Sequence, residues 1–310
     1  MTTADTKIRD LIEQLLERRR PNAKSLIVSV FGDAVLPHGG SVALSSLVEL
    51  MALFGINERG VRTSVFRLAR EGWLASHQLG RRSFYDLTES GRLRFQAAHQ
   101  AIYAAGPQPW HGLWTFVLTG LFEQETRDKL RADLSWQGFG QILPGVMVHP
   151  SPDESSLRQA LRDAGITEGG YVINASGKDW MGAKDLRDIV GRAWDLAALA
   201  AGYQAFLESF RPFVWLVTEA APSPETSFRL RTLLIHDYRR ALLRDPRLPD
   251  ELLPAAWPGA AARLLCRNLY RQVQASAEDY LVGQLETAEG RIPDADPSYF
   301  QRFGGVAAEG

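Results

Sequence analysis

The stretch that decides the fold is Gly55-Ile-Asn-Glu-Arg-Gly-Val-Arg-Thr-Ser-Val-Phe-Arg-Leu68. Within it Val61, Val65 and Leu68 recur at i, i+4 and i+7, which is the spacing of one buried face of an α-helix. Apart from Phe66, the positions between them are polar or cationic, so the other side of this helix faces solvent. The pattern therefore predicts a helix over residues 58–71 that follows a tight turn at Gly55.

A hairpin follows this helix in the sequence. Trp73–Leu79 and Ser83–Leu87 are short strand-like segments, and Gly80-Arg81-Arg82 between them predicts a turn. Three further helices are predicted around these elements, over Ser25–Val35, from Ser41 or Ser45 to Phe54, and from Thr88 to Tyr103. Helix, turn, helix and hairpin in this order are the parts of a winged helix-turn-helix.

The outward side of the helix over residues 58–71 is cationic. It carries Arg59, Thr63, Phe66 and Arg70, flanked by Arg62 and Arg67. An α-helix fits the major groove of duplex DNA, where arginine pairs with guanine and threonine contacts the thymine methyl group. Arg81 and Arg82, at the hairpin tip, are placed to reach phosphates or the minor groove. These arginines could instead solvate an ordinary helix, but the tight turn, the exposed Thr63 and Phe66 and the basic hairpin together favour DNA binding.

The charge distribution favours a polyanionic partner for this region alone. The whole chain has a formal net charge of −1, but residues 56–96 contain eight arginines and no lysine against four acidic residues. The single cysteine, Cys266, excludes a disulfide framework. The N-terminal residues lack the apolar core of a signal peptide, and no apolar stretch reaches the ~20 residues that cross a bilayer. We therefore expect a cytoplasmic protein that makes no contact with a membrane.

A second region begins after Ala105-Gly-Pro-Gln-Pro-Trp110, where two prolines and a glycine interrupt any helix. Strand-like and helix-like segments then alternate over about 60 residues, which predicts a small α/β sandwich of the split βαβ type. These segments are Leu113–Thr119, Glu123–Trp136, Gln141–His149, Ser155–Ala164 and Tyr171–Asn174.

The last third of the chain is predicted to be helical. Apolar residues from Leu186 to Phe210 recur in steps of three and four, which predicts one long helix with a continuous apolar seam. Further helices are predicted over Glu225–Leu243 and Ala260–Gln284, and only Phe213–Val217 has the composition of a strand. The long seam could be a core contact or a dimer contact, and the sequence leaves both open.

No catalytic or metal-binding pattern is present, so we expect no enzyme, no metal and no cofactor. The six histidines are scattered without ligand spacing, and GxSxG, Walker and GxGxxG motifs are absent. The alternative is a nucleic-acid-processing enzyme that uses the middle region. It would need a carboxylate at the end of its first strand to hold a divalent cation, and Leu113–Gly120 offers none. Near the chain end, Arg302-Phe-Gly-Gly305 is interpreted as a flexible tail.

Several motifs together resemble one known family. The motifs that carry the resemblance are Ser25-Leu-Ile-Val-Ser-Val-Phe-Gly-Asp33, the stretch from Gly55 to Leu68, Gly138-Phe-Gly140 with Leu143-Pro-Gly145, Trp194-Asp195, His236-Asp-Tyr-Arg-Arg240, and Arg244-Asp-Pro246 through Trp257-Pro-Gly259. In this order they resemble the PaaX-type repressors of phenylacetic acid degradation over nearly the whole chain. The resemblance assigns DNA reading to Arg59, Arg62, Thr63, Phe66 and Arg67.

The resemblance implies an α+β protein with three domains. These are a winged-helix domain over residues 1–105, a ferredoxin-like middle domain over 111–180, and a helical effector and dimerisation domain over 181–310. It also implies a homodimeric repressor of an aromatic catabolic operon, bound to double-stranded operator DNA. An acyl-coenzyme A such as phenylacetyl-coenzyme A would release the repressor from its operator.

One predicted helix outside the winged domain could hold that effector. If Leu230, Leu234, Tyr238 and Ala241 point inward, a cationic face lies on the other side of the helix. The candidate effector residues are Arg229, His236, Tyr238, Arg239 and Arg240. Arginine is well suited to the phosphates of coenzyme A. A solvated surface or a polar contact with another domain would give the same pattern.

Overall fold

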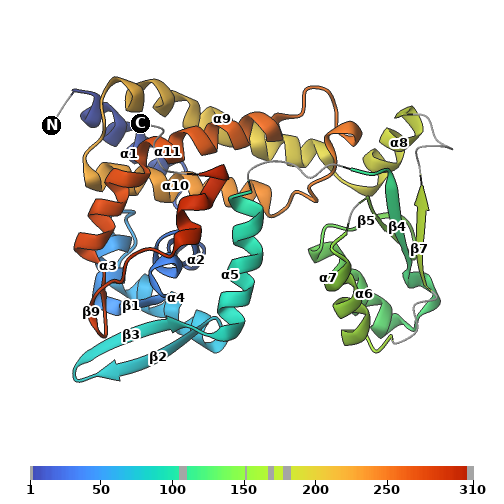
Figure 1. Cartoon of the computed structure of the whole chain (residues 1–310), viewed down its shortest axis with the longest axis horizontal. Helices are drawn as coiled ribbons and strands as arrows, with labels where there is room; N and C mark the ends of the chain where they lie inside the picture. Colours follow the sequence, from blue (N-terminus) through green and yellow to red (C-terminus); the bar gives the residue numbers. More distant parts are fainter. Residues whose placement is uncertain (1–2, 105–109, 151, 167–170, 177–182, 306–310) are drawn as a thin grey trace. The chain divides into compact units, whose positions relative to one another are not determined.

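The computed structural model describes residues 3–104, 110–150, 152–166, 171–176 and 183–305 (Figure 1). The predicted break at residues 105–109 and the predicted boundary at 180/181 lie outside them. The chain forms two compact units, one of residues 1–105, 203–242 and 259–310, the other of 106–202 and 243–258. Among the described residues no helix combines the length and the apolar character needed to cross a bilayer.

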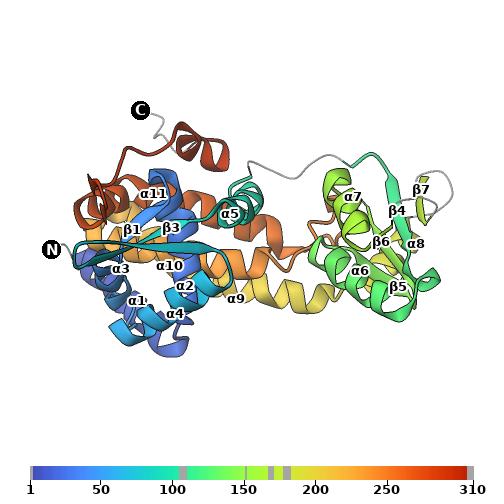
Figure 2. The same ribbon diagram turned by 90° about the horizontal axis from the view of Figure 1, so that it is seen from below.

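The first unit contains the predicted winged helix. Its elements are α1 (Thr3–Arg18), α2 (Ala23–Val30), a π-helical turn η1 (Phe31–Val35), η2 (Leu36–His38), β1 (Ser41–Ala43), α3 (Leu44–Ala52), α4 (Glu58–Arg70), β2 (Leu74–Leu79), β3 (Arg82–Leu87) and α5 (Glu89–Ile102). The three strands form an antiparallel sheet in the order β1-β3-β2. In both views α2 lies between α4 and α10 (Pro224–Leu242), and it packs against each of them (Figures 1 and 2).

Local sequence explains where α4 begins and which side it buries. The Asn57 side chain caps the helix by accepting a hydrogen bond from the Gly60 backbone N–H at 2.9 Å. Val61, Val65 and Leu68 are buried, as their spacing predicts. The helix and its apolar face are therefore confirmed.

The second unit has the topology of a ferredoxin-like sandwich. It contains β4 (Leu113–Leu118), η3 (Thr119–Leu121), α6 (Gln124–Trp136), β5 (Gly140–Leu143), β6 (Val146–His149), α7 (Glu154–Asp163), β7 (Val172–Ser176) and α8 (Ala183–Ala193). The sheet is antiparallel in the order β5-β6-β4-β7. The single strand predicted over Gln141–His149 is wrong, because Gly145, at a φ of 80°, turns the chain between β5 and β6.

Two predictions for the stretch after α8 are also wrong. The single helix from Leu186 to Phe210 is broken at Trp194-Asp195 into α8 and α9 (Leu196–Glu219). Asp195 starts the second helix, because its carboxylate accepts a hydrogen bond from the Ala198 N–H at 2.9 Å. Phe213–Val217 is helical rather than extended and lies inside α9, since a short apolar run does not by itself distinguish strand from helix.

The residues predicted as a separate C-terminal domain, 181–310, are divided between the two units. Most of the helical residues, including all of α10 and nearly all of α11, belong to the unit that contains the winged helix. The elements after α9 are α10, η4 (Asp250–Leu252), α11 (Pro258–Gln284), β8 (Glu286–Thr287), β9 (Gly290–Arg291) and η5 (Pro297–Gly304). These helices pack with the winged helix because α10 is buried there, and all of its residues from Thr226 to His236 are buried.

A buried ionic cluster holds this unit together around Asp33, in the π-helical turn. Arg231 of α10 donates from Nε to Asp33 Oδ2 at 2.8 Å, and Arg302 of η5 donates from Nη1 to Oδ1 at 3.0 Å. Tyr103 and Tyr270 add hydroxyl donors to Oδ1 at 2.6 and 3.0 Å. Burial raises the pKa of Asp33, but the two guanidinium groups outweigh it and hold the pKa below its ordinary value.

A second carboxylate balances the charges of the cluster. Glu278 of α11 accepts from Arg231 Nη1 at 2.9 Å and lies 2.5 Å from His38 Nε2. Burial raises the pKa of Glu278, but the His38 hydrogen bond and Arg231 lower it to about 2. Two carboxylates therefore face two arginines, which satisfies the requirement that buried charges be paired.

Arg302 shows that the flexible tail predicted over Arg302–Gly305 is wrong. Its guanidinium lies 4.2 Å from the Tyr103 ring centroid and 4.5 Å from that of Tyr299. The Phe303 N–H donates to the Tyr103 carbonyl at 2.9 Å, at the C-terminal end of α5. Buried cation–π contacts and an ion pair thus hold this segment on the winged helix.

We predict that Arg302→Ala lowers the free energy of unfolding of the first unit by about 3–5 kcal/mol, because it leaves Asp33 buried with one cation fewer. Urea unfolding followed by far-UV circular dichroism measures the change. Arg211→Ala, at an exposed position of α9, is the control and should change it by about 0.5 kcal/mol or less. A loss below about 1 kcal/mol for Arg302→Ala would contradict the role of the cluster.

Candidate nucleic-acid interface

The sequence-predicted DNA-binding residues share one exposed surface formed by α4 and the β2–β3 hairpin. All of them are exposed to solvent, and Phe66 keeps 59% of its surface accessible. The residues are Arg59, Arg62, Thr63, Phe66, Arg67 and Arg70 of α4, and Arg81 and Arg82 of the hairpin. An aromatic side chain this exposed in the middle of a cationic helix face suits contact with a partner.

The hairpin is a tight wing with two cations at its end. β2 and β3 pair from Leu74–Leu87 to Leu79–Arg82, which leaves Gly80 and Arg81 as the turn. Gly80 takes a φ of 63°, a conformation that glycine adopts readily. The guanidinium carbon of Arg82, at the start of β3, lies 5.5 Å from the centre of the buried Phe84 ring. This contact holds the Arg82 side chain against the hairpin.

Two of the arginines on this surface already have acidic partners. Arg62 pairs with Glu58 one turn earlier on α4 at 2.7 Å. Arg82 pairs with Glu286 of the β8–β9 hairpin. The backbone N–H of Glu286 donates a hydrogen bond to Ser46 Oγ of α3 at 3.3 Å. In the described part of the chain, Arg59, Arg67, Arg70 and Arg81 form no ion pair. These four arginines are therefore free to meet phosphates or base edges.

The predicted effector helix, α10, is not an exposed cationic face. Arg229 is buried and donates to Glu13 Oε1 of α1 at 2.6 Å. Tyr238 is buried, as its inward position predicts, with its ring 5.5 Å from that of Phe206. Arg239 is partly buried and donates from Nη2 to the Ser25 carbonyl of α2 at 3.1 Å. The periodicity of the helix does not predict that Arg229 and Arg239 face inward. Each of them can do so because a partner distant in the sequence accepts its hydrogen bond, the Glu13 carboxylate for Arg229 and the Ser25 carbonyl for Arg239.

The remaining two predicted effector residues line a cavity together. His236 and Arg240 of α10, together with residues of α1 and of the segment that follows α1, line a cavity of about 250 Å³. Arg18 and Arg19, which the sequence analysis did not select, lie in the same wall. The signal available in the sequence was the run Arg18-Arg19-Arg20 at the end of the first helix, whose position next to α10 only the fold reveals.

In the described ranges, no three His, Cys, Asp or Glu side chains gather in a way that could hold a metal ion. Strand β4 presents Thr115, whose hydroxyl donates to Asn174 Oδ1 on β7 at 2.8 Å, in place of a carboxylate. Cys266 lies on α11 in the first unit, where it is fully buried, and burial raises the pKa of its thiol.

Comparison with known proteins gives matches along most of the chain. Residues 22–91 match the family model described as PaaX-like protein, residues 107–188 the PaaX protein central Cas2-like domain, and residues 194–283 the PaaX-like protein C-terminal domain. The transcriptional repressor PaaX of Escherichia coli is 38% identical over 306 residues, which cover 98% of this chain and 97% of that protein. An uncharacterized protein from Mycobacterium tuberculosis has a similar structure, with a TM-score of 0.51 at 25% identity over 82% of this chain and 98% of that one.

These matches bear on two sequence-based expectations. The resemblance to PaaX-type proteins over nearly the whole chain is confirmed by the three family models and the near-complete relative. The name of that relative describes a regulator of transcription, which confirms the expectation of a regulator over the alternative of an enzyme.

We predict that Glu286→Gln raises the affinity for duplex DNA about two- to fivefold, because the Glu286 carboxylate competes with phosphate for Arg82 and an exposed pair contributes about 0.2–1 kcal/mol. Fluorescence anisotropy with a labelled duplex measures the affinity. Glu289→Gln removes the same charge from an exposed position of the same hairpin, where no ion pair forms within the described residues. Equal gains for both variants would show a general charge effect and would count against the Arg82 pairing.

Proposed function

The chain belongs to the PaaX family, and from that premise we propose that it represses the transcription of an aromatic, phenylacetate-type catabolic operon by binding its operator. The observation that carries the proposal is the exposed cationic surface of α4 and the wing, with four arginines free of ion pairs within the described residues. Family membership alone would leave open which surface meets DNA.

In this proposal α4 enters the major groove and the wing follows the backbone. The exposed side of α4 offers Arg67 and Thr63 to base edges, where each bidentate arginine–guanine pair discriminates by about 1–3 kcal/mol. Arg81 at the wing tip contacts phosphate, which adds affinity but no sequence information. Arg62 can turn from Glu58 to DNA at low cost, because an exposed pair on a helix surface is weak.

We predict different losses for the two parts of the surface. Arg67→Ala should lose about 1–3 kcal/mol of operator binding and little binding to random duplex. Arg81→Ala should weaken both about equally and reduce the slope of log K against log salt by about one. Titrations of operator and random duplex at several salt concentrations measure both effects. Unchanged operator affinity in Arg67→Ala would contradict the assignment of α4.

A homodimer is the second part of the proposal. Two recognition helices that read one face of B-DNA lie about 34 Å apart, or a multiple of that distance, so the operator should contain an inverted repeat with matching spacing. Sedimentation of the chain with its operator duplex should give two chains per duplex. One chain per duplex at saturation would contradict the dimer.

The third part is release by an acyl-coenzyme A, with phenylacetyl-coenzyme A as the test compound. By linkage, an effector that releases DNA must bind the DNA-free protein more tightly than the complex. We predict that phenylacetyl-coenzyme A lowers operator affinity about fivefold or more at saturation, whereas coenzyme A without the acyl group has a smaller effect. Operator titrations with each compound test this, and an operator affinity that neither compound changes would contradict it.

A further inference from the structure

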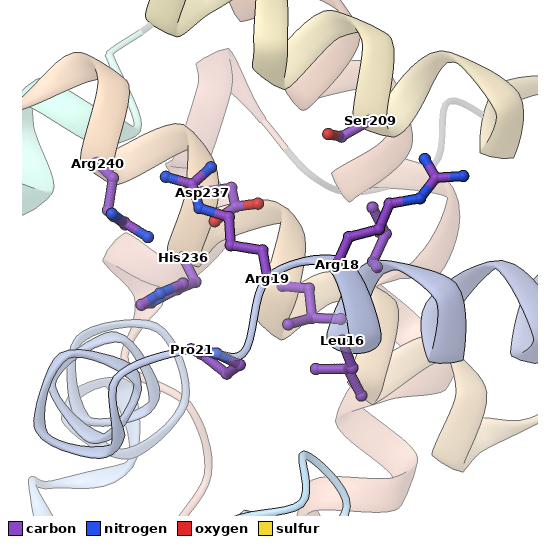
Figure 3. Close-up of a pocket in the computed structure, with 10 residues that line it drawn as sticks. Leu16, Arg18, Arg19, Pro21, Ser209, His236, Asp237 and Arg240 are labelled. Atoms are coloured by element: carbon purple, nitrogen blue, oxygen red, sulfur yellow. The ribbon is translucent and has the colours of Figure 1, made fainter.

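The cavity between α1 and α10 is the part of the first unit whose chemistry is not used by DNA reading. It has a volume of about 250 Å³ and is lined on one side by leucines of α1 and α10, including Leu16 and Leu233. Figure 3 shows the polar side, with Arg19 and Asp237 between Arg240 and His236 on one hand and Arg18 and Ser209 on the other. The cavity is thus apolar at one wall and cationic at the other.

The arginines of this cavity are exposed and, in the part of the chain that the structure describes, form no ion pair, unlike the buried arginines of the first unit. Arg231 and Arg302 are satisfied by Asp33, and Arg229 by Glu13. Within the described residues, Arg18, Arg19 and Arg240 form no ion pair. Asp237 is the one acid of the lining, against these three arginines, so the wall keeps an excess of positive charge.

His236 adds a buried polar atom with no partner in the described structure. It is 1% exposed, and its Nδ1 lies 2.9 Å from Ser29 Oγ of α2. The Ser29 hydroxyl donates to the Ser25 carbonyl at 3.1 Å, so Nδ1 carries the ring proton and donates to Ser29. Nε2 is then a buried acceptor without a donor, which costs free energy until a ligand supplies one.

The charges around His236 explain why its ring stays neutral. Burial, together with the smaller effects of the charges of Arg239, Arg240 and Arg19, lowers the pKa of His236 to about 3. A dianion placed among these arginines would reverse that effect. Protonated His236 could then donate from Nε2 to the same anion.

We propose that this cavity binds a phosphate-bearing small molecule, whose phosphate is held by Arg19 and Arg240 next to His236. The charges of Arg19 and Arg240 both act on Asp237 and His236, so the two guanidinium groups lie on the same side of the cavity. Two neighbouring guanidinium groups that form no ion pair within the described residues are suited to phosphate recognition. The leucine wall receives an apolar part of the same molecule. This inference rests on the proposed function in one respect, namely that the molecule is the effector.

The cavity is connected through hydrogen bonds of α10 to α2, the helix that packs against α4. His236 and Arg239, on the same helix α10, bond to Ser29 and Ser25 of α2, and α2 packs against α4. A ligand that draws Arg240 or His236 toward itself therefore acts on the helix that supports α4. Occupancy of the cavity can in this way change the affinity for DNA.

Calorimetry with inorganic pyrophosphate as the probe tests the cavity without DNA. The wild-type chain should bind it, and Arg19→Ala and Arg240→Ala should each weaken binding about tenfold through the loss of a charge-assisted contact. Both side chains are exposed at one end and form no ion pair in the described structure, so the variants should fold. Arg211→Ala, on α9 and outside the cavity, should bind pyrophosphate as the wild type does.

Operator release separates this inference from the proposed function. If both hold, the two cavity variants bind operator normally but need about tenfold more phenylacetyl-coenzyme A for release. Pyrophosphate binding that depends on Arg19 and Arg240, without any release by the thioester, supports the cavity and contradicts the proposed effector. Pyrophosphate affinity that is absent, or equal in all variants, overturns the cavity. Loss of operator affinity in the cavity variants also overturns it, because the arginines would then face DNA.

Discussion

The carboxylate of Asp33 is the constraint on which the first unit depends. A buried carboxylate is stable only when it is paired and hydrogen-bonded, and Asp33 satisfies this with partners from α5, α10, α11 and η5. Those partners lie between 70 and 269 residues away in the sequence. The charge of one residue in the π-helical turn thus requires the winged helix and the C-terminal segments to fold against each other.

This constraint gives the protein a direct route between a ligand cavity and DNA. α10 is held by Asp33 through Arg231, contacts α2 through His236 and Arg239, and lines the cavity with Arg240. Because α10 and the winged helix share one core, a change at the cavity need not cross a flexible linker to reach α4. The second unit, with its ferredoxin-like sheet, has its own apolar core around Leu130 and Leu157.

The sequence predicts those parts of the fold that depend on local signals. The helix over α4, its outward arginines and the hairpin with Gly80 at its turn follow from periodicity and turn chemistry, and the structure has each of them. The candidate effector site was predicted less well. Tyr238 is buried as its periodicity predicts, but Arg229 is buried as well, because helix periodicity cannot show which distant acid neutralises an inward arginine. Arg18 and Arg19 line the cavity through the packing of α1 near α10, which no local pattern shows. Arg302 was missed for the same reason, since its partner Asp33 is 269 residues away.

Native-state hydrogen exchange of the full-length chain tests the central claim, that the Asp33 cluster makes the winged helix and the C-terminal helices one cooperative unit. The account predicts that the most protected amides of α2, α10 and α11 exchange through a common opening, with the same free energy and the same dependence on denaturant. It also predicts that Arg302→Ala lowers all three free energies equally. Amides of α10 and α11 that keep their protection while those of α2 lose it would contradict the account.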